Sequence, residues 1–229
     1  MPSGKVLIMN NSLSHTQLVE IINAFLDKYH SDLSYCHGAD HVRRVAKLAV
    51  KIGKVEKVDL ELVEIAALLH DIGVVPLAWG RHASGKDDNE FQEFLGTYAL
   101  PSYDHGEVGA LIAERFLNQY NYPQGKTKQV TLIIKEHNTH SQTSLESRVV
   151  NDADKLEALG ATWVARAFQR TSAFDRKTSI EVIPKKYLEG RKPIFDSFHT
   201  ETGKKMAEQR FEFLLSFIEQ FQRELSLET

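Results

Sequence analysis

The sequence predicts an all-α protein. Apolar residues recur at helical spacing along most of the chain, and the alternating polar and apolar pattern of strands is almost absent. The 229 residues, 42% of them hydrophobic, are enough for one sizeable core, and no internal repeat divides the chain. We therefore expect one structural domain, a helical array with two long surface loops. Residues 1–34 would supply an N-terminal helix packed on a core formed by residues 35–229.

Three helices are predicted in the first third of the chain. The first follows Ser14 and Gln17, which can form a capping box. The second can end at Gly53, and the third begins after Asp59, a suitable N-cap residue. The third helix becomes apolar on all sides near its end, as a buried central helix does. The apolar faces of the three helices cover residues 18–26, 41–52 and 59–70.

The rest of the chain alternates between helices and two long irregular segments. Residues 73–103 have no sustained period and contain glycines, prolines and a polar cluster, so we predict a loop with one short helical piece near Phe91. Residues 171–199 are also irregular, and they are basic. The other predicted helices begin near residues 104 and 126, span about 147–168, and close the chain over about 200–224.

Composition narrows the range of partners and of compartments. A formal net charge of −3 gives no overall attraction to nucleic acid or to an anionic membrane. The single cysteine, Cys36, excludes an internal disulfide and a thiolate zinc site. The N-terminal apolar run is too short for a signal peptide, and no stretch approaches the roughly 18 apolar residues of a membrane span. We therefore expect a cytoplasmic protein whose partners include neither nucleic acid nor membrane.

The stretch ALLHDIGVV, residues 67–75, places His70 and Asp71 side by side at the end of an apolar helix. Burying either side chain without a partner would cost several kcal/mol, and one metal ion could serve both. With residues from other helices, the candidate metal ligands are His41, His70, Asp71, His105, His137 and Asp154. Imidazole and carboxylate without thiolate suit a catalytic divalent site. A single inward histidine at a helix end is more often a core or capping residue than a metal ligand, so the prediction depends on the whole set.

Three further residues near these positions carry weaker signals. Arg44 is expected in an ion pair on the helix surface or between helices. His37 precedes His41 by four residues, as in a zincin helix, but Gly38 stands where the glutamate base of that motif would be. His30 has no supporting pattern. We therefore leave all three out of the predicted site.

An ordered pattern, H…HD…D, links the candidate ligands. It is formed by His41 in DHVRRVAKLA, by His70 and Asp71 in LLHDIG, and by Asp154 in NDADKLEALGA. With this pattern the chain resembles the HD-domain metal-dependent phosphohydrolases, an all-helical superfamily, and its bacterial branch in particular. The C-terminal HTETGKKMAEQRFEFLLSFIEQF is similar to the closing helix of that branch, so the resemblance covers about residues 35–224.

The resemblance implies a particular metal centre. His105 in DHGEVGA and His137 in IIKEHN fill the middle positions of the extended pattern H…HD…H…H…D, which is seen in dinuclear members. In that pattern Asp71 would bridge two ions, the first also bound by His41, His70 and Asp154 and the second by His105 and His137. A one-metal site, in which the latter two histidines contact phosphate, is the alternative. The cofactor would be one or two divalent ions per chain: Mn, Fe, Ni, Co, Zn or Mg.

The implied activity is hydrolysis of a phosphate ester or anhydride of a small phosphorylated metabolite, with a nucleotide as the expected substrate. The ions would generate the nucleophile from water and neutralise phosphoryl charge. His70 and Asp71 would be catalytic through the metal, and Lys155, next to Asp154, would bind phosphate. A dinuclear-iron oxygenase and a non-catalytic nucleotide sensor are the alternatives. The substrate stays open, because the histidine-phenylalanine segment usual in this branch is not evident in residues 171–199. The sequence does not fix the oligomeric state.

Overall fold

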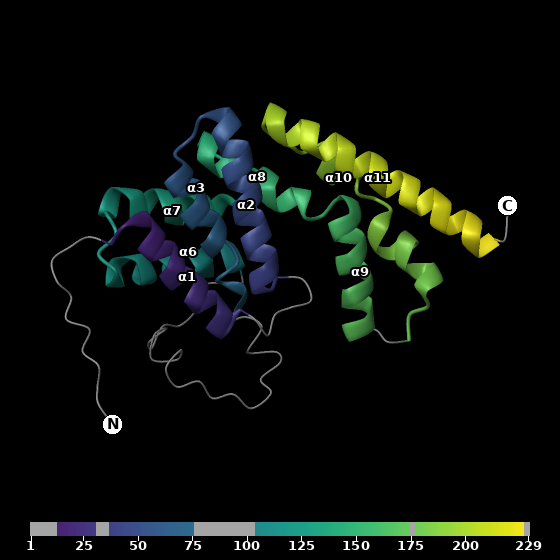
Figure 1. Ribbon diagram of the computed structural model, residues 1–229, viewed down its shortest axis with the longest axis horizontal. Helices are drawn as coiled ribbons and strands as arrows, with labels where there is room; N and C mark the ends of the chain where they lie inside the picture. Colours follow the sequence, from purple (N-terminus) through teal and green to yellow (C-terminus); the bar gives the residue numbers. More distant parts are fainter. Residues whose placement is uncertain (1–12, 31–36, 76–103, 175–176, 227–229) are drawn as a thin grey trace, which may run out of the picture.

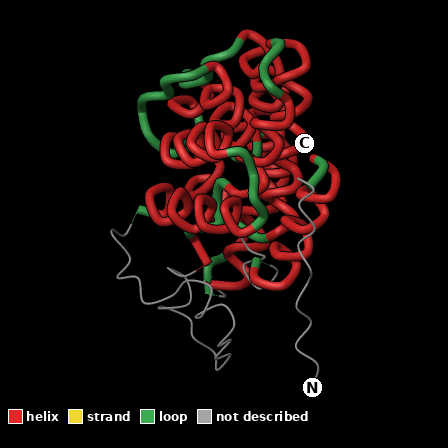
Figure 2. Tube along the Cα trace, turned by 90° about the vertical axis from the view of Figure 1, so that its left-hand side faces the viewer, coloured by secondary structure: helices red, strands yellow, loops and turns green. Residues whose placement is uncertain are grey.

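The computed structural model describes residues 13–30, 37–75, 104–174 and 177–226. Every regular element within these ranges is helical, and none is a β-strand (Figure 2). The all-α prediction is therefore confirmed, whereas the short helical piece expected near Phe91 lies outside the described residues. The helices are α1 (His15–Tyr29), α2 (Ala39–Glu56), α3 (Leu60–Leu69), α6 (His105–Gln119), α7 (Gln124–Glu136), α8 (Leu145–Leu156), α9 (Gly160–Phe174), η2 (Ile180–Val182), η3 (Pro184–Leu188), α10 (Lys192–Phe195) and α11 (Glu201–Ser226).

Helix α3 lies at the centre of the array (Figure 1). It packs against α1, α2, α7 and α8, and α6 packs on α7. Seven of the ten residues of α3 are buried, in agreement with its apolar sequence. Because α3 is buried on most sides, the two residues that follow it are delivered to the interior of the array.

The predicted capping residues at the first and third helices are confirmed. Ser14 and Gln17 form a capping box at the start of α1. Asp59 accepts a hydrogen bond from the backbone N–H of Leu62 at the start of α3. Asp104 caps α6 in the same way. These caps fix the first turns of three helices that carry or support the site.

The second helix is longer than predicted. It passes through Gly53 and ends at Glu56, and Lys57 follows in the left-handed conformation with φ 61°. Gly53 serves helix packing instead, since a Cβ at this position would lie 2.9 Å from Val58 Cγ2. The absence of a side chain therefore brings α2 close to the connection that leads into α3.

The single helix predicted over residues 147–168 is wrong, because the chain forms two helices, α8 and α9, in this stretch. Gly160 has φ 72°, a left-handed conformation that favours glycine at a helix break. Arg210, from α11, donates a hydrogen bond to the carbonyl of Leu156 at the end of α8. The same carbonyl also accepts from the backbone N–H of Leu159, at 3.2 Å, so Arg210 adds a long-range partner at the helix end.

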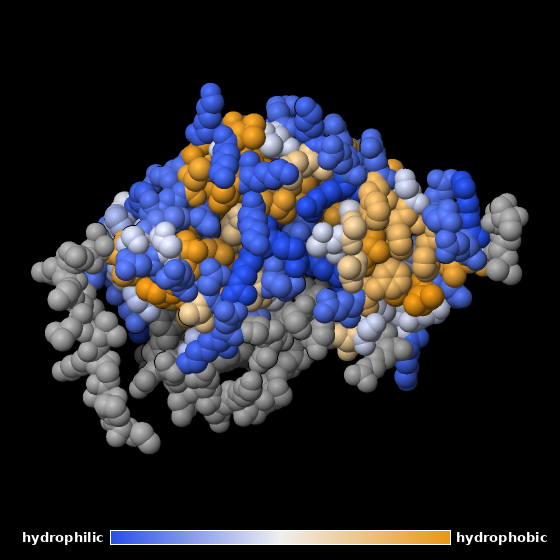
Figure 3. All heavy atoms as spheres, in the orientation of Figure 1, coloured by the Kyte–Doolittle hydropathy of each residue, from blue (hydrophilic) through white to orange (hydrophobic). Residues whose placement is uncertain are grey.

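Residues 171–199 are more regular than predicted. Helix α9 extends to Phe174, and the short helices η2, η3 and α10 follow it. The segment packs against α9 and α11. Figure 3 shows a patch of hydrophobic residues over α9 and this segment, beside a hydrophilic band over α2. The basic side chains of residues 171–199 therefore lie on or beside short helices.

In the described part of the chain, no helix has the length and apolar character required to cross a membrane.

Asp152 joins α8 to the start of α11. Its side chain is fully buried, and its carboxylate accepts hydrogen bonds from the backbone N–H groups of His199 and Thr200 and from the Thr200 hydroxyl, at 2.7–2.9 Å. Gly203 permits this approach, because a Cβ there would lie 2.5 Å from Asp152 Oδ2. The closing helix is thus docked on the helix that carries Asp154.

Candidate metal centre

The turn that follows α3 carries the adjacent His70 and Asp71 and lies directly against α6. Gly73 makes this contact possible. A Cβ on Gly73 would fall 2.0 Å from the carbonyl oxygen of His105 and 2.5 Å from the backbone nitrogen of Gly109. The close approach brings the first turn of α6 to the His-Asp pair.

One carboxylate oxygen of Asp71 faces a first group of donors. Asp71 Oδ2 lies 3.3 Å from His70 Nε2 and 3.6 Å from His41 Nε2. Asp154 Oδ1 lies 3.3 Å from His41 Nε2 and 3.8 Å from His70 Nε2. The side chains of His41, His70 and Asp71 are buried, whereas that of Asp154 is 34% exposed. Donors from α2, α8 and the turn after α3 therefore surround one point that is open on the Asp154 side.

The other oxygen of Asp71 faces a second group. Asp71 Oδ1 lies 3.6 Å from His105 Nε2 and 3.7 Å from His137 Nε2. The two histidine nitrogens are 3.2 Å apart. His105 is the first residue of α6, and His137 follows the last residue of α7. Asp71 therefore presents one oxygen to each of two donor groups.

Backbone carbonyls orient two of the histidine rings. His70 Nδ1 lies 2.7 Å from the carbonyl oxygen of Ala67, and His137 Nδ1 lies 2.6 Å from that of Ile134. A carbonyl can only accept, so each Nδ1 donates. In the neutral ring the lone pair is then on Nε2, which faces Asp71. Such a contact fixes both the tautomer and the direction of a metal-binding histidine.

Glu157 lies on the Nδ1 side of His41, although His41 Nδ1 makes no hydrogen bond within the described residues. Its Oε2 lies 3.6 Å from His41 Nδ1 and accepts a hydrogen bond from Arg44 Nε at 2.7 Å. Arg44 also donates to Asp40 on the same helix, at 2.6 Å, so it forms one ion pair on the surface of α2 and one, to Glu157, between helices, as expected. Burial would raise the pKa of Glu157, but its interactions with His41 and Arg44 outweigh that effect and lower it. The ionised carboxylate is therefore held against His41.

The carboxylates of the site are ionised. Burial alone would raise the pKa of Asp71, but the charges of His70 and His37 lower it well below the usual range. The pKa of Asp154 is also lowered, because the interaction with His41 and the charge of His70 outweigh the effect of desolvation. Two neighbouring ionised carboxylates, one of them buried, need positive charge nearby, which a bound cation supplies directly.

The donor set fits a divalent metal ion. Three overlapping groups each bring three ligand atoms within 4.8 Å of one another: His37, His41 and Asp71; His41, His70 and Asp154; and His70, Asp71 and His137. In addition, the buried His70 Nε2 makes no hydrogen bond. Nitrogen and carboxylate donors without thiolate suit Mn, Fe, Co, Ni or Zn. These groups contain five of the six residues that the sequence singled out, together with His37, and the sixth, His105, has its Nε2 3.2 Å from His137 Nε2 and 3.6 Å from Asp71 Oδ1.

Metal affinity should rise with pH in the range below about pH 9. Burial would lower the pKa of His70, but Asp71 and Asp154 outweigh it and raise the value to about 9. A metal ion needs the neutral ring, so binding near pH 7 must release this proton. We expect affinity to increase up to about tenfold per pH unit, measured by calorimetric titration between pH 6.5 and 8.5.

The same raised pKa stabilises the metal-free fold. This contribution is complete below the unfolded-state value of about 6.5 and disappears as the pH rises through about 9. Titrations in two buffers of different ionisation enthalpy would count the protons released. Equal affinity across the pH range, with no proton release, would contradict the assignment of His70 as a ligand.

Two histidines contact the site although the sequence did not predict them. His37 Nδ1 lies 2.7 Å from Asp71 Oδ2, and its side chain is 45% exposed. His30 is fully buried, and its Nε2 donates to the backbone carbonyl of Asp71 at 3.1 Å. Burial lowers the pKa of His30 to about 4, so it is neutral and acts as a hydrogen-bond donor. The only sequence signal for His37 was its spacing of four from His41.

Lys155, predicted to bind phosphate, contacts the segment that precedes α11. Its Nζ donates to the carbonyl oxygen of Ser197 at 2.7 Å and lies 3.5 Å from His199 Nε2. Burial lowers its pKa, while the nearby charges of Asp152 and Asp154 act in the opposite direction. Successive side chains on an α-helix differ in direction by about 100°. Lys155 therefore leaves α8 towards the segment before α11, although its neighbour faces the histidines.

The fold and the site together define a helical protein with a candidate divalent-metal centre built on an adjacent His-Asp pair. The family model described as HD domain matches residues 38–159. This chain therefore belongs to the HD-domain family. The matched residues include all six candidate ligands, from His41 on α2 to Asp154 on α8.

Relatives extend the similarity beyond the matched segment. The uncharacterized protein YpgQ of Bacillus subtilis (strain 168) is 30% identical over 213 residues, which cover 90% of this chain and 93% of YpgQ. The crystal structure of YpgQ in complex with ADP is similar with a TM-score of 0.63 and 27% identity, and 93% of this chain aligns with 97% of that one. A predicted HD superfamily hydrolase from an uncultured Thermotogales bacterium has a TM-score of 0.63 and 28% identity, with coverages of 93% and 99%.

Proposed function

We propose that this protein is a metal-dependent phosphohydrolase that cleaves a phosphate ester or anhydride of a small metabolite, with a nucleotide as the favoured substrate. The proposal depends chiefly on Asp71, whose two oxygens face two separate donor groups. This placement supports a centre of two ions bridged by Asp71. The first ion would also be held by His41, His70 and Asp154, and the second by His105 and His137.

The residues around the site would each have a defined task. Bound divalent ions supply an activated water near neutral pH and neutralise charge on a phosphoryl oxygen. His70 and Asp71 hold the reacting centre, and the carbonyls and Glu157 behind the rings keep the histidine nitrogens directed at it. Lys155 is a further proposed phosphate contact. To take that role, its ammonium group must exchange the carbonyl of Ser197 for a phosphate oxygen.

A nucleotide is favoured because of one related structure. YpgQ, to which this chain is 27% identical in the structural alignment, was crystallised in complex with ADP. The alignment covers 93% of this chain and 97% of the YpgQ chain. A nucleotide also has the negative charge that a cationic metal centre attracts.

The proposal predicts metal-dependent release of phosphate or pyrophosphate. Protein purified without chelator should contain one or two divalent ions per chain by elemental mass spectrometry. Metal-free protein would then be reloaded in turn with Mn, Fe, Co, Ni, Zn or Mg and assayed with nucleoside mono-, di- and triphosphates and with cyclic dinucleotides. We expect turnover with at least one metal, and loss of that turnover when a chelator is added.

Two outcomes would contradict the proposal. Two irons per chain with oxygen consumption and no phosphate release would favour a dinuclear-iron oxygenase. Nucleotide binding without turnover, with every metal in the panel, would favour a non-catalytic sensor. The three readouts separate the three functions, because only hydrolysis releases phosphate and only oxygenation consumes oxygen.

A further inference from the structure

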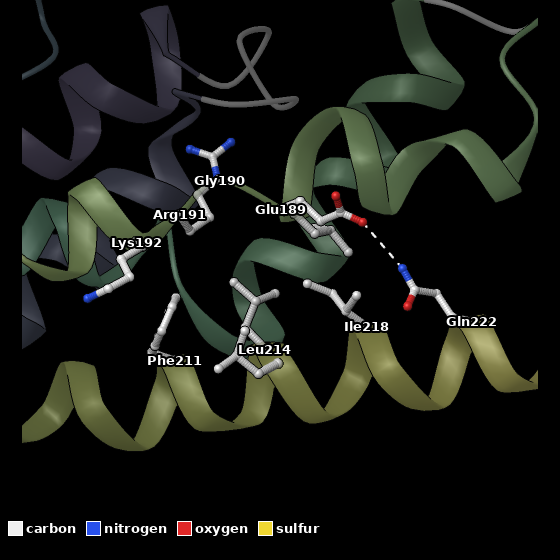
Figure 4. A pocket seen from close by; sticks show the side chains of 10 residues that line it. Glu189, Gly190, Arg191, Lys192, Phe211, Leu214, Ile218 and Gln222 are labelled. Atoms are coloured by element: carbon white, nitrogen blue, oxygen red, sulfur yellow. Dashed lines mark hydrogen bonds between the residues drawn. The ribbon is translucent and has the colours of Figure 1, made fainter.

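Two helical parts of the described chain lie outside the segment that the family model matches: α1, and the helices from α9 onwards. The later helices border an apolar groove between α11 and the end of η3, lined by Leu188, Leu214 and Ile218 among others (Figure 4). None of the described residues that line this groove is a candidate metal ligand. Helix α1, in contrast, ends beside the His-Asp turn. His30, its C-terminal capping residue, donates from Nε2 to the backbone carbonyl oxygen of Asp71 at 3.1 Å.

The carbonyl of Asp71 belongs to the turn that follows α3. It also accepts from the backbone N–H of Val74 at 2.9 Å, and the N–H of Ile72 donates to the carbonyl of Leu69 at 3.1 Å. These two bonds join residues three apart, so they close the turn from within. His30 adds a donor from a position 41 residues earlier in the chain. The main chain of Asp71 is therefore held from outside the turn as well.

The position of this main chain matters because the two oxygens of Asp71 face separate donor groups. Oδ2 lies 3.3 Å from His70 Nε2, and Oδ1 lies 3.7 Å from His137 Nε2. The aspartate carboxylate is separated from its Cα by a single methylene group, so a shift of the backbone moves both oxygens together. Residues that support metal ligands contribute about 10- to 100-fold to metal affinity. A contact that fixes the backbone of Asp71 would therefore act on both donor groups.

Packing alone does not account for a histidine at position 30. The side chain is fully buried, and its Nδ1 makes no hydrogen bond among the described residues. A buried polar nitrogen without a partner costs free energy that an apolar side chain would not. An apolar side chain would, however, lack the donor to the Asp71 carbonyl. That donor is what the histidine supplies to this place in the fold.

Helix α1 is anchored by polar contacts to two neighbouring helices. Arg43 of α2 donates to Asn23 Oδ1 at 2.7 Å and to Asp27 at 2.6 Å. At the start of α1, His15 contacts Glu64 of α3 at 2.7 Å. These contacts hold α1 against α2 and α3, the helices that lead to the metal centre. The donor at the end of α1 therefore has a defined position relative to the His-Asp turn.

We propose that His30 is a positioning residue of the metal centre, whose hydrogen bond holds the main chain of Asp71 so that each carboxylate oxygen faces its donor group. This role rests on the proposed function, in which Asp71 is the metal ligand that both groups share. His30 acts through Asp71 and is not itself a ligand. The role also makes α1, which the family match does not include, a part of the site that the match contains.

Cobalt(II) tests this role on the full chain, because Co²⁺ suits the donor set and its visible absorption reports the coordination of the ion. His30→Leu and His30→Phe remove the donor, whereas His30→Gln keeps an N–H donor at a similar reach. We expect the two donor-free variants to bind Co²⁺ about tenfold more weakly in calorimetric titrations and to change its spectrum. His30→Gln should retain most of the affinity and the wild-type spectrum.

His15→Leu is the matched control. It removes the other histidine contact of α1 described above, to Glu64, at the end of the helix that is remote from the turn. We expect this variant to bind Co²⁺ like wild type, with an unchanged spectrum. Urea denaturation of the metal-free proteins measures the stability of each variant separately from its metal affinity.

Three outcomes would overturn the role of His30. The first is wild-type Co²⁺ affinity and spectrum in both donor-free variants. The second is an equal loss in His30→Gln, which would assign the effect to the ring and not to the hydrogen bond. The third is an equal loss in His15→Leu, which would assign it to the docking of α1 as a whole.

Failure of the proposed function would give a different result. Wild-type protein would bind Co²⁺ but hydrolyse no phosphorylated compound with any metal of the panel, while the donor-free variants would still lose Co²⁺ affinity. In that case the hydrolase proposal fails and the role of His30 stands. Conversely, a hydrolase whose donor-free variants bind Co²⁺ like wild type would retain the proposed function and lose only the role of His30.

Discussion

Asp71→Asn is expected to reduce phosphohydrolase turnover by more than about 100-fold, because residues that merely support metal ligands already contribute 10- to 100-fold. Asp71 is the residue that both donor groups share. Replacement of one oxygen by an amide removes the negative charge and leaves one donor group facing an N–H donor. Metal content should therefore fall together with activity.

The measurement pairs elemental analysis with the turnover assay. Wild type and Asp71→Asn would be compared for ions per chain, far-ultraviolet circular dichroism and rate. The matched control is Asp59→Asn, which makes the same chemical change at the opposite end of α3, where asparagine caps as well as aspartate. An Asp71→Asn variant with wild-type metal content and a near-wild-type rate would show that Asp71 is not a bridging ligand.

Gly73→Ala should damage the second donor group while leaving the first largely intact. The added Cβ would meet the His105 carbonyl at 2.0 Å and the Gly109 nitrogen at 2.5 Å, and backbone atoms of a packed helix cannot easily move aside. The start of α6 would therefore shift, and His105 with it. We expect loss of about one ion per chain and a decrease in the free energy of unfolding of about 1–3 kcal/mol.

Gly125→Ala is the matched control for this change. Gly125 lies in the first turn of α7, and no atom lies within 4 Å of the position of its Cβ. Alanine there should leave metal content unchanged and stabilise the protein slightly. Urea denaturation and elemental analysis of both variants provide the comparison. Equal behaviour of the two alanine variants would mean that the contact between the His-Asp turn and α6 does not position His105.

Local sequence signals predicted the helices, but not the break between α8 and α9, where residues distant in the sequence make contact. Ser14 and Asp59 each accept a hydrogen bond from the residue three positions later, so the sequence around them is sufficient to identify the caps. The break between α8 and α9 depends on Arg210, which approaches Leu156 from a helix 54 residues away. Gly160 marked the position, but a glycine within a helical pattern is often tolerated.

The residues of the candidate site also divide into those that local patterns predicted and those that they did not. Residues on periodic helices, such as His41 and His137, were found because an apolar period fixes the face to which each side chain belongs. His37 precedes α2 and has no period of its own, so its contact with Asp71 could not be read from spacing. Lys155 was assigned from its adjacency to Asp154, but adjacent residues on a helix diverge by about 100°.

The buried carboxylate of Asp152 has a consequence for where this protein can be shortened. The family match ends at residue 159, yet the hydrogen-bond donors to Asp152 come from residues 199 and 200. A chain that stopped after the match would lose the donors of residues 199 and 200 to this carboxylate and the Arg210 donor to the Leu156 carbonyl, which would keep only the N–H of Leu159, at a cost of about 1–3 kcal/mol. We therefore expect the segment that carries every candidate metal ligand to be less stable alone than in the full chain. Its stability depends in part on the C-terminal helix, which contributes none of those ligands.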